Sequence, residues 1–225
     1  MWSLTNVEAV WHGIQEDKSL ETFGLLLGGY RGVVVADMMS THLSAAKSLP
    51  GLTLAACWAH CLRKFRDAAL NHPEAEFALA RIGQLYAIDA EATDLDHKLE
   101  LRRTRSTAVL EELKTWLLAR RTISTTTLGK AVSYTLNSWH HLQRFTTNAR
   151  IWLDNNPTER SLRGPVVGRR NHFGSKSKAG TQVAAVFYTL METAKAQGVD
   201  PAKYLRQAVI AARAGRVLLP GDASL

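Results

Sequence analysis

Residues 32–37 read GVVVAD, an apolar run of five residues that ends on an acid. A short continuous apolar run is typical of a strand that is buried on both faces, as in the parallel sheets of α/β proteins. Asp37 would then lie at the carboxyl end of a central strand, where open α/β sheets place their functional sites. This segment therefore predicts the fold class and a first candidate site residue.

The segments on either side of this run alternate between strand and helix. Residues 7–14 (VEAVWHGI) are rich in residues that favour strands, and residues 19–27 carry Leu and Phe at helical spacing, with Ser19 as a plausible N-cap. A short helix is expected over 41–49, and residues 52–56 (LTLAA) form another apolar strand. The order strand, helix, strand, helix, strand predicts an α/β sheet with parallel portions.

The rest of the chain is expected to be helical. Residues 74–121 are rich in Ala, Leu, Glu and Arg, with leucines at the spacing of amphipathic helices, and residues 128–145 continue this pattern. Further helices are predicted near 157–163, over 181–197 and from 201 to about 212. The inward face of helix 181–197 is predicted to consist of Val183, Phe187, Leu190 and Ala194.

The composition limits the class of protein. Hydrophobic residues make up 46% of the chain and charged residues 21%, which is ordinary for a globular protein. No apolar run approaches the ~20 residues that a membrane-spanning helix needs, and the N-terminus does not resemble a secretory signal. The two cysteines, Cys57 and Cys61, do not form a disulfide framework, which indicates a reducing compartment. We therefore expect a cytoplasmic protein with no membrane partner.

The positive charge indicates a polyanionic partner. The formal net charge is +8 and the pI is about 9.7, and each phosphate that a protein neutralises releases counterions. No acidic residue occurs between Arg160 and Met191. The basic residues in that stretch are Arg160, Arg163, Arg169, Arg170, Lys176 and Lys178. Two interpretations are open at this point, a solvated face or loop and a phosphate-binding surface.

Two acidic residues are candidate metal ligands, and each could instead have a purely structural role. Asp37 could cap the turn that follows its strand. Glu159 follows Asn156 and Pro157, a combination that predicts a helix start in which Glu159 reaches back to the Asn156 amide. The chemical interpretation is that Asp37 and Glu159 share a divalent metal, because Mg²⁺ and Mn²⁺ prefer carboxylate oxygens.

A second group of candidate ligands lies at Cys57, His60 and Cys61. Positions separated by three and four residues share one face of a helix, so the three side chains could bind zinc. A structural zinc site needs a fourth ligand, and packing of small apolar cysteines near a strand end is the favoured interpretation. Alternatively, His60 could face the DNA or the metal site together with Arg63, Lys64 and Arg66.

Five segments resemble, in order, the motifs of the insertion-sequence-66 transposase family. They are residues 31–37 (RGVVVAD), 57–65 (CWAHCLRKF), 154–163 (DNNPTERSLR), 168–171 (GRRN) and 191–205 (METAKAQGVDPAKYL). The resemblance extends from about residue 2 to residue 213. It implies a ribonuclease-H-like mixed sheet core with an acid triad, in which Asp37 is the second acid and Glu159 the third. Both would hold Mg²⁺ or Mn²⁺.

The same resemblance implies a division of the chain and a set of partners. Residues 1–70 would form the core strands and helices, 71–148 a large helical insertion, 149–213 the C-terminal part of the core with the Glu-bearing helix, and 214–225 a flexible tail. DNA, as transposon ends and target, would be the main partner, with other transposase subunits or helper proteins. The Arg160–Lys178 basic residues, Arg63 and Lys64 would then contact phosphates.

The family's first acid is expected on a strand upstream of Met1. We therefore expect this chain to lack the first core strand with its acid, and to be weak or inactive alone in cleavage and strand transfer. The alternative is a non-catalytic DNA- or protein-binding remnant that associates with an intact transposase. Alanine substitutions at Asp37 and Glu159 would separate the two, because unchanged behaviour favours the remnant.

Overall fold

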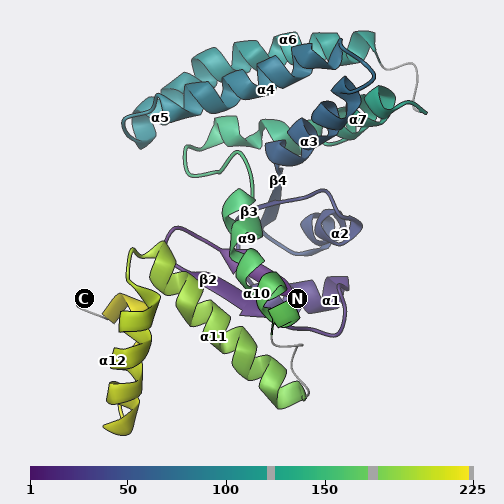
Figure 1. The fold of residues 1–225 in the computed structure, drawn as a ribbon. Helices are drawn as coiled ribbons and strands as arrows, with labels where there is room; N and C mark the ends of the chain where they lie inside the picture. The colour runs from purple at the N-terminus through teal and green to yellow at the C-terminus, as the bar shows by residue number, and fades with distance from the viewer. Residues whose placement is uncertain (121–124, 172–176, 223–225) are drawn as a thin grey trace. The chain divides into compact units, whose positions relative to one another are not determined.

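The computed structural model describes residues 1–120, 125–171 and 177–222. It is a mixed α/β structure that is mostly helical and contains two small sheets (Figure 1). The chain divides into two compact units. The terminal unit comprises Met1–Lys18 and Asn156–Leu225, and the central unit comprises Ser19–Asn155. No helix in the described ranges is long and apolar enough to cross a membrane.

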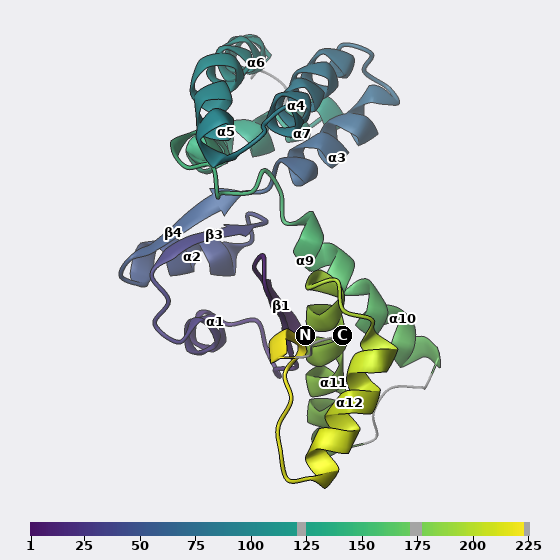
Figure 2. The same cartoon turned by 90° about the vertical axis from the view of Figure 1, so that its left-hand side faces the viewer.

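A parallel pair of strands forms the sheet of the central unit. β3 (Gly32–Ala36) pairs with β4 (Leu52–Ala56), with Gly32 opposite Leu52 and Ala36 opposite Ala56. The connecting helix α2 (Ser40–Ser48) packs against β4 (Figure 2). Both predicted strands are confirmed. Within the central unit β3 pairs with β4, and its residues Gly32–Val35 are partly buried.

The helix before β3 begins and ends as its sequence predicts. In α1 (Leu20–Leu27) the side chain of Ser19 accepts a hydrogen bond of 3.1 Å from the Thr22 amide, which satisfies a free donor of the first turn. Gly28 ends the helix in the left-handed conformation, with φ 55°, which glycine adopts without steric cost.

Helices make up the remainder of the central unit. They are α3 (Trp58–Ala69), α4 (Ala75–Ala90), α5 (Leu95–Leu101), the π-helical turn η1 (Arg102–Ser106), α6 (Thr107–Ala119), α7 (Thr127–Asn137), α8 (Trp139–Leu142) and the 3-10 turn η2 (Gln143–Thr147). Their apolar faces form one core with Ala55 and Ala56 of β4. The helical prediction for 74–121 and 128–145 is confirmed over the described residues.

A buried arginine joins three parts of this helical region. Arg102 is 1% exposed, and its Nε lies 2.6 Å from an oxygen of Asp89 in α4. Its Nη1 donates to the carbonyl oxygens of Phe145 and Asn148, at 3.0 and 2.8 Å. The charge and the donors of Arg102 therefore have partners, as burial of a guanidinium requires.

The terminal unit begins with a hairpin. β1 (Trp2–Thr5) and β2 (Val10–Gly13) are antiparallel. Between them the Asn6 side chain accepts hydrogen bonds from the amides of Glu8 and Ala9, at 2.9 and 2.7 Å. This turn explains why the predicted strand over 7–14 is too long, because residues 7–9 form part of the turn.

Helix α11 (Lys178–Ala196) lies along β2 (Figure 1) and forms hydrogen bonds with its backbone. The other helices of this unit are α9 (Asn156–Ser161), α10 (Arg163–Asn171), α12 (Pro201–Arg213) and the 3-10 turn η3 (Pro220–Asp222). In α11 (Lys178–Ala196) the Thr189 and Thr193 hydroxyls accept hydrogen bonds from the amides of His12 and Val10, at 2.9 and 3.1 Å. Thr193 also donates to the Val10 carbonyl oxygen at 2.9 Å.

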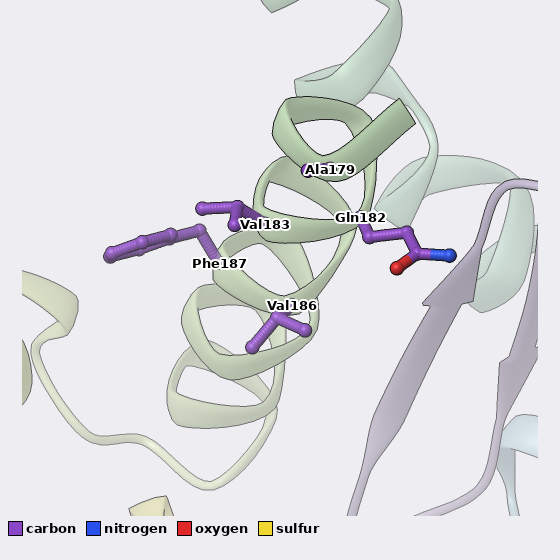
Figure 3. A pocket seen from close by; sticks show the side chains of 5 residues that line it. All are labelled: Ala179, Gln182, Val183, Val186 and Phe187. Atoms are coloured by element: carbon purple, nitrogen blue, oxygen red, sulfur yellow. The ribbon is translucent and has the colours of Figure 1, made fainter. Parts of the chain in front are cut away.

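The predicted inward face of α11 is wrong at two of its four positions. Val183 and Phe187 are 54% and 47% exposed, whereas Ala194 is buried. Figure 3 shows Val183 and Phe187 projecting away from the hairpin strands, beside an open surface depression. The apolar spacing predicted the inward face incorrectly because the side of the helix that meets β2 carries threonines, which bond to the strand.

Candidate active site

The first candidate, Asp37, follows β3 at the carboxyl edge of the parallel pair. The Cys57 amide donates to the Ala36 carbonyl oxygen at 3.1 Å, so the backbone pairing extends to the residue that follows β4. Because parallel strands end at the same edge, Asp37 and Cys57 both lie at the edge where α/β sheets carry their sites.

His42, in the first turn of α2, contacts Asp37 directly. Its Nδ1 lies 2.7 Å from Oδ1 and 3.1 Å from the backbone carbonyl oxygen of Asp37. His42 lowers the pKa of Asp37 most strongly; His60 and a hydrogen bond from the Met39 amide also lower it, while burial opposes them. Asp37 is therefore anionic at neutral pH. The hydrogen bond from the Met39 amide is the contact expected if Asp37 caps the turn after its strand. It is also compatible with Asp37 as a metal ligand.

Two of the sequence motifs meet beside this edge. The Trp58 amide donates to the Leu153 carbonyl oxygen at 2.9 Å, and the Asn155 amide donates to Cys57 Sγ at 3.4 Å. The hydroxyl of Tyr86 donates to Oδ2 of Asp154 at 2.8 Å. Burial and the neighbouring Asp154 carboxylate raise the pKa of Tyr86, which keeps its proton in this bond. These bonds attach the start of the motif at residues 154–163 to α3 and α4.

The second candidate acid, Glu159, belongs to the terminal unit. It lies in α9 and is partly buried. The Ser161 hydroxyl at the end of this helix lies 3.1 Å from the Ser3 hydroxyl of β1. Asp37 and Glu159 are thus described in different units, and the shared metal site remains a prediction.

Most of the predicted DNA-contacting residues are exposed on helices. Arg160, Arg163, Arg169 and Arg170 are exposed on α9 and α10. Lys178 is 3.3 Å from Glu16, an ion pair that contributes little because both side chains are more than 80% exposed. Lys176 lies outside the described residues. The two interpretations of this stretch, a solvated face and a phosphate-binding surface, both stay open.

The basic residues of α3 belong to the central unit. Arg63 and Lys64 are exposed, and the Lys64 ammonium lies 4.5 Å from the centre of the Tyr134 ring. This cation–π contact is compatible with a phosphate contact, since an ammonium group carries three donors.

The cysteines are buried thiols. Cys57 and Cys61 are 1% and 0% exposed, and burial raises the pKa of both, that of Cys61 to about 12. This burial is compatible with the favoured interpretation, in which both cysteines pack as small apolar side chains. Cys57 precedes α3 instead of lying within it, so the predicted shared helix face does not include Cys57. Across the described ranges, no three His, Cys, Asp or Glu side chains are grouped closely enough for a metal ion.

Two contacts at this edge were missed by the sequence reasoning. His42 lies five residues after Asp37, and a histidine in the first turn after a strand-end acid is a usable signal. Tyr86 and Asp154 are far apart in the sequence, and their spacing carries no signal of contact. At this edge the Asp37 carboxylate suits a divalent cation, because it is anionic and partly exposed.

The fold and this edge define a mixed α/β protein with an acid at the end of a parallel strand. Residues 1–183 match the family model described as "Transposase IS66 family", so the chain belongs to the IS66 family of transposases. Two relatives come from Sinorhizobium fredii. The uncharacterized protein y4jD is 31% identical over 91% of this chain and 42% of its own length. The uncharacterized protein y4qI is 29% identical over 90% of this chain and 40% of its own length.

These relatives are longer than the chain. The chain spans about 40% of the length of the curated relatives it matches. No solved structure matches it.

Proposed function

We propose that this chain carries part of the catalytic core of a DNA transposase and that Asp37 and Glu159 are two acids of its active site. The observation that carries the proposal is Asp37 itself, an anionic carboxylate at the carboxyl end of a parallel strand. Family membership over residues 1–183 supports the reaction class.

The proposed core is ribonuclease-H-like, with residues 71–148 as its helical insertion. The order of elements supports this proposal: a hairpin, then helix, strand with acid, helix and strand precede the helical region. The Glu159-bearing helix follows that region and would open the C-terminal part of the core. Both cysteines are free thiols, which suits the expected cytoplasmic compartment.

Asp37 and Glu159 would hold Mg²⁺ or Mn²⁺. When bound, such ions activate the attacking oxygen and stabilise the leaving oxygen of a phosphodiester. Asp37 contributes a negative charge that its neighbours keep ionised. Tyr86 and Cys57 hold the segment that precedes the Glu159 helix through their bonds to Asp154 and Asn155.

DNA is the proposed partner, both as transposon ends and as target. The exposed arginines Arg160, Arg163, Arg169 and Arg170 would contact phosphates, together with Lys176, Lys178, Arg63 and Lys64. The complete absence of acids between Arg160 and Met191 supports a polyanion-binding stretch. The proposal includes weak or absent strand transfer by this chain alone, with further transposase segments or subunits as its partners.

A non-catalytic DNA- or protein-binding remnant is the second candidate. It is favoured by one observation, that Arg160, Arg163, Arg169 and Arg170 are all exposed on α9 and α10. Such a remnant would retain the basic stretch and tolerate loss of Asp37 and Glu159.

Calorimetric titration with Mn²⁺ separates the two candidates. Asp37→Asn and Glu159→Gln each remove one negative charge with little change in shape, and each is expected to weaken Mn²⁺ binding by about 10-fold or more. Asp96→Asn, at an exposed acid of α5, is the matched control and should bind as the wild type does. Equal affinity in all four proteins would contradict the catalytic proposal and favour the remnant.

A further inference from the structure

One carboxylate oxygen of Asp37 is enclosed, although the side chain as a whole is partly exposed. Oδ1 is buried and lies 2.7 Å from His42 Nδ1, whereas the Asp37 side chain as a whole is 30% exposed. The exposed part of the side chain therefore does not include Oδ1. Asp37 has an enclosed side next to His42 and an open side toward solvent.

The imidazole of His42 is held in place by its surroundings. The His42 side chain is only 12% exposed, and its ring centroid lies 5.1 Å from that of Phe23, at an interplanar angle of 57°. Phe23 is buried in α1. Packing by an aromatic ring on a neighbouring helix limits rotation of the imidazole, so Nδ1 stays directed toward Asp37.

Nδ1 lies near two oxygens of the same residue. The contact with the Asp37 carbonyl oxygen, at 3.1 Å, has the geometry of a hydrogen bond. The contact with Oδ1 is shorter but lacks that geometry, so it is a close approach of the two groups. A proton on Nδ1 is directed at the carbonyl oxygen, and it lies close enough to Oδ1 to attract the negative charge of the carboxylate. This arrangement fixes the backbone and the side chain of Asp37 together.

We propose that His42 is a positioning residue for Asp37, which keeps Oδ1 enclosed and leaves Oδ2 for a divalent cation. The inference rests on the proposed function of Asp37 as a metal ligand. Carboxylates that bind metals are commonly held by a second hydrogen-bonding group, and loss of that group typically lowers metal affinity by about 10- to 100-fold. His42 supplies such a group from the helix that follows the strand.

Substitutions at His42 test this role through Mn²⁺ affinity, without any need for enzymatic activity. His42→Leu keeps an apolar side chain against Phe23 and removes the Nδ1 donor, so it is expected to weaken Mn²⁺ binding by about 10-fold or more. His42→Asn places an amide N–H at the reach of Nδ1, and is expected to stay within about 3-fold of the wild type. His140→Leu, at an exposed histidine of α8, is the control.

Thermal unfolding of the same variants separates positioning from structural support. A structural role alone would lower the melting temperature of His42→Leu and His42→Asn and leave their Mn²⁺ affinities equal to that of the wild type. If the leucine variant does not fold, His42→Gln replaces it. Its amide lies one bond farther from the backbone, so it should bind Mn²⁺ less tightly than His42→Asn does.

Asp37→Asn distinguishes failure of this inference from failure of the proposed function. If Asp37→Asn loses Mn²⁺ binding while His42→Leu does not, the positioning role is overturned and the metal site stands. If the wild type does not bind Mn²⁺, or Asp37→Asn binds it equally well, the proposed function and this inference both fail.

Discussion

His12 is buried without the hydrogen bonds that an imidazole normally makes. It is 2% exposed in β2, and within the described part of the chain neither ring nitrogen has a hydrogen-bond partner. Burial lowers the pKa of His12, and Glu192 on α11 opposes this effect only in part. The ring is therefore neutral in the folded protein at neutral pH.

This state of His12 predicts a dependence of stability on pH. An unfolded histidine has a pKa of about 6.5 and binds a proton as the pH falls through that value, whereas folded His12 does not until a lower pH. Stability is therefore fully present above the unfolded pKa and decreases below it. His12→Leu should remove this contribution, which urea unfolding at pH 8 and pH 5.5 can measure.

The decisive quantity is the difference between the two proteins in the unfolding free energy lost from pH 8 to pH 5.5, because changes common to both cancel. The wild type should lose more stability than His12→Leu between pH 8 and pH 5.5. Equal losses in both proteins would contradict the neutral, buried state of His12.

Helix α11 takes the place of a neighbouring strand for β2. Thr189, Thr193 and Gln197 recur every four residues and bond to the backbone of His12, Val10 and Glu8, the last at 2.8 Å. Four helical residues advance about 6 Å and two strand residues about 6.8 Å, so the two repeats nearly match. The polar groups of this strand edge are satisfied by side chains.

Removal of one hydroxyl from this series should destabilise the terminal unit. Thr193→Val preserves shape and leaves the buried Val10 amide and carbonyl without the Thr193 hydroxyl, which costs about 1–3 kcal/mol of unfolding free energy. Thr115→Val, at an exposed threonine whose hydroxyl bonds within α6, should change stability by about 0.5 kcal/mol or less. Chemical denaturation measures the unfolding free energy of both variants. Equal losses would argue against a stabilising role for the contacts of Thr189, Thr193 and Gln197 with β2.

The sequence predicted elements wherever the signal was local. The strands at 32–36 and 52–56 and the helix start at Ser19 follow from short apolar runs and a capping hydroxyl. The exposed side of α11 at Val183 and Phe187 was not predicted, since it depends on which face meets β2. His42 lies close to Asp37 in the sequence, which is a signal, but the contact between the two side chains depends on how α2 packs after β3.

The basic stretch of the whole chain predicts salt-dependent binding to DNA. Each lost phosphate contact lowers the slope of log K against log salt by about 0.9 for duplex DNA, so four neutralised contacts lower it by about 3.6. The variant carries glutamine at Arg160, Arg163, Arg169 and Arg170. The control, with the same change in net charge, carries glutamine at the exposed central-unit residues Arg31, Lys47, Arg103 and Lys130.

Binding of a fluorescent duplex at several salt concentrations gives both slopes. We expect a reduced slope for the α9–α10 variant and a nearly unchanged slope for the control. Equal reductions would mean that net charge, and not this basic stretch, controls binding.

The central claim is that Asp37 and Glu159 act on the same metal. A double-mutant cycle of Mn²⁺ affinity, with Asp37→Asn, Glu159→Gln and the combined variant, tests it most directly. If the two carboxylates share one site, the combined variant should bind within about 2-fold of the weaker single variant, because contacting residues are not additive. Losses that multiply, or a Glu159→Gln variant that binds Mn²⁺ as the wild type does, would contradict the claim.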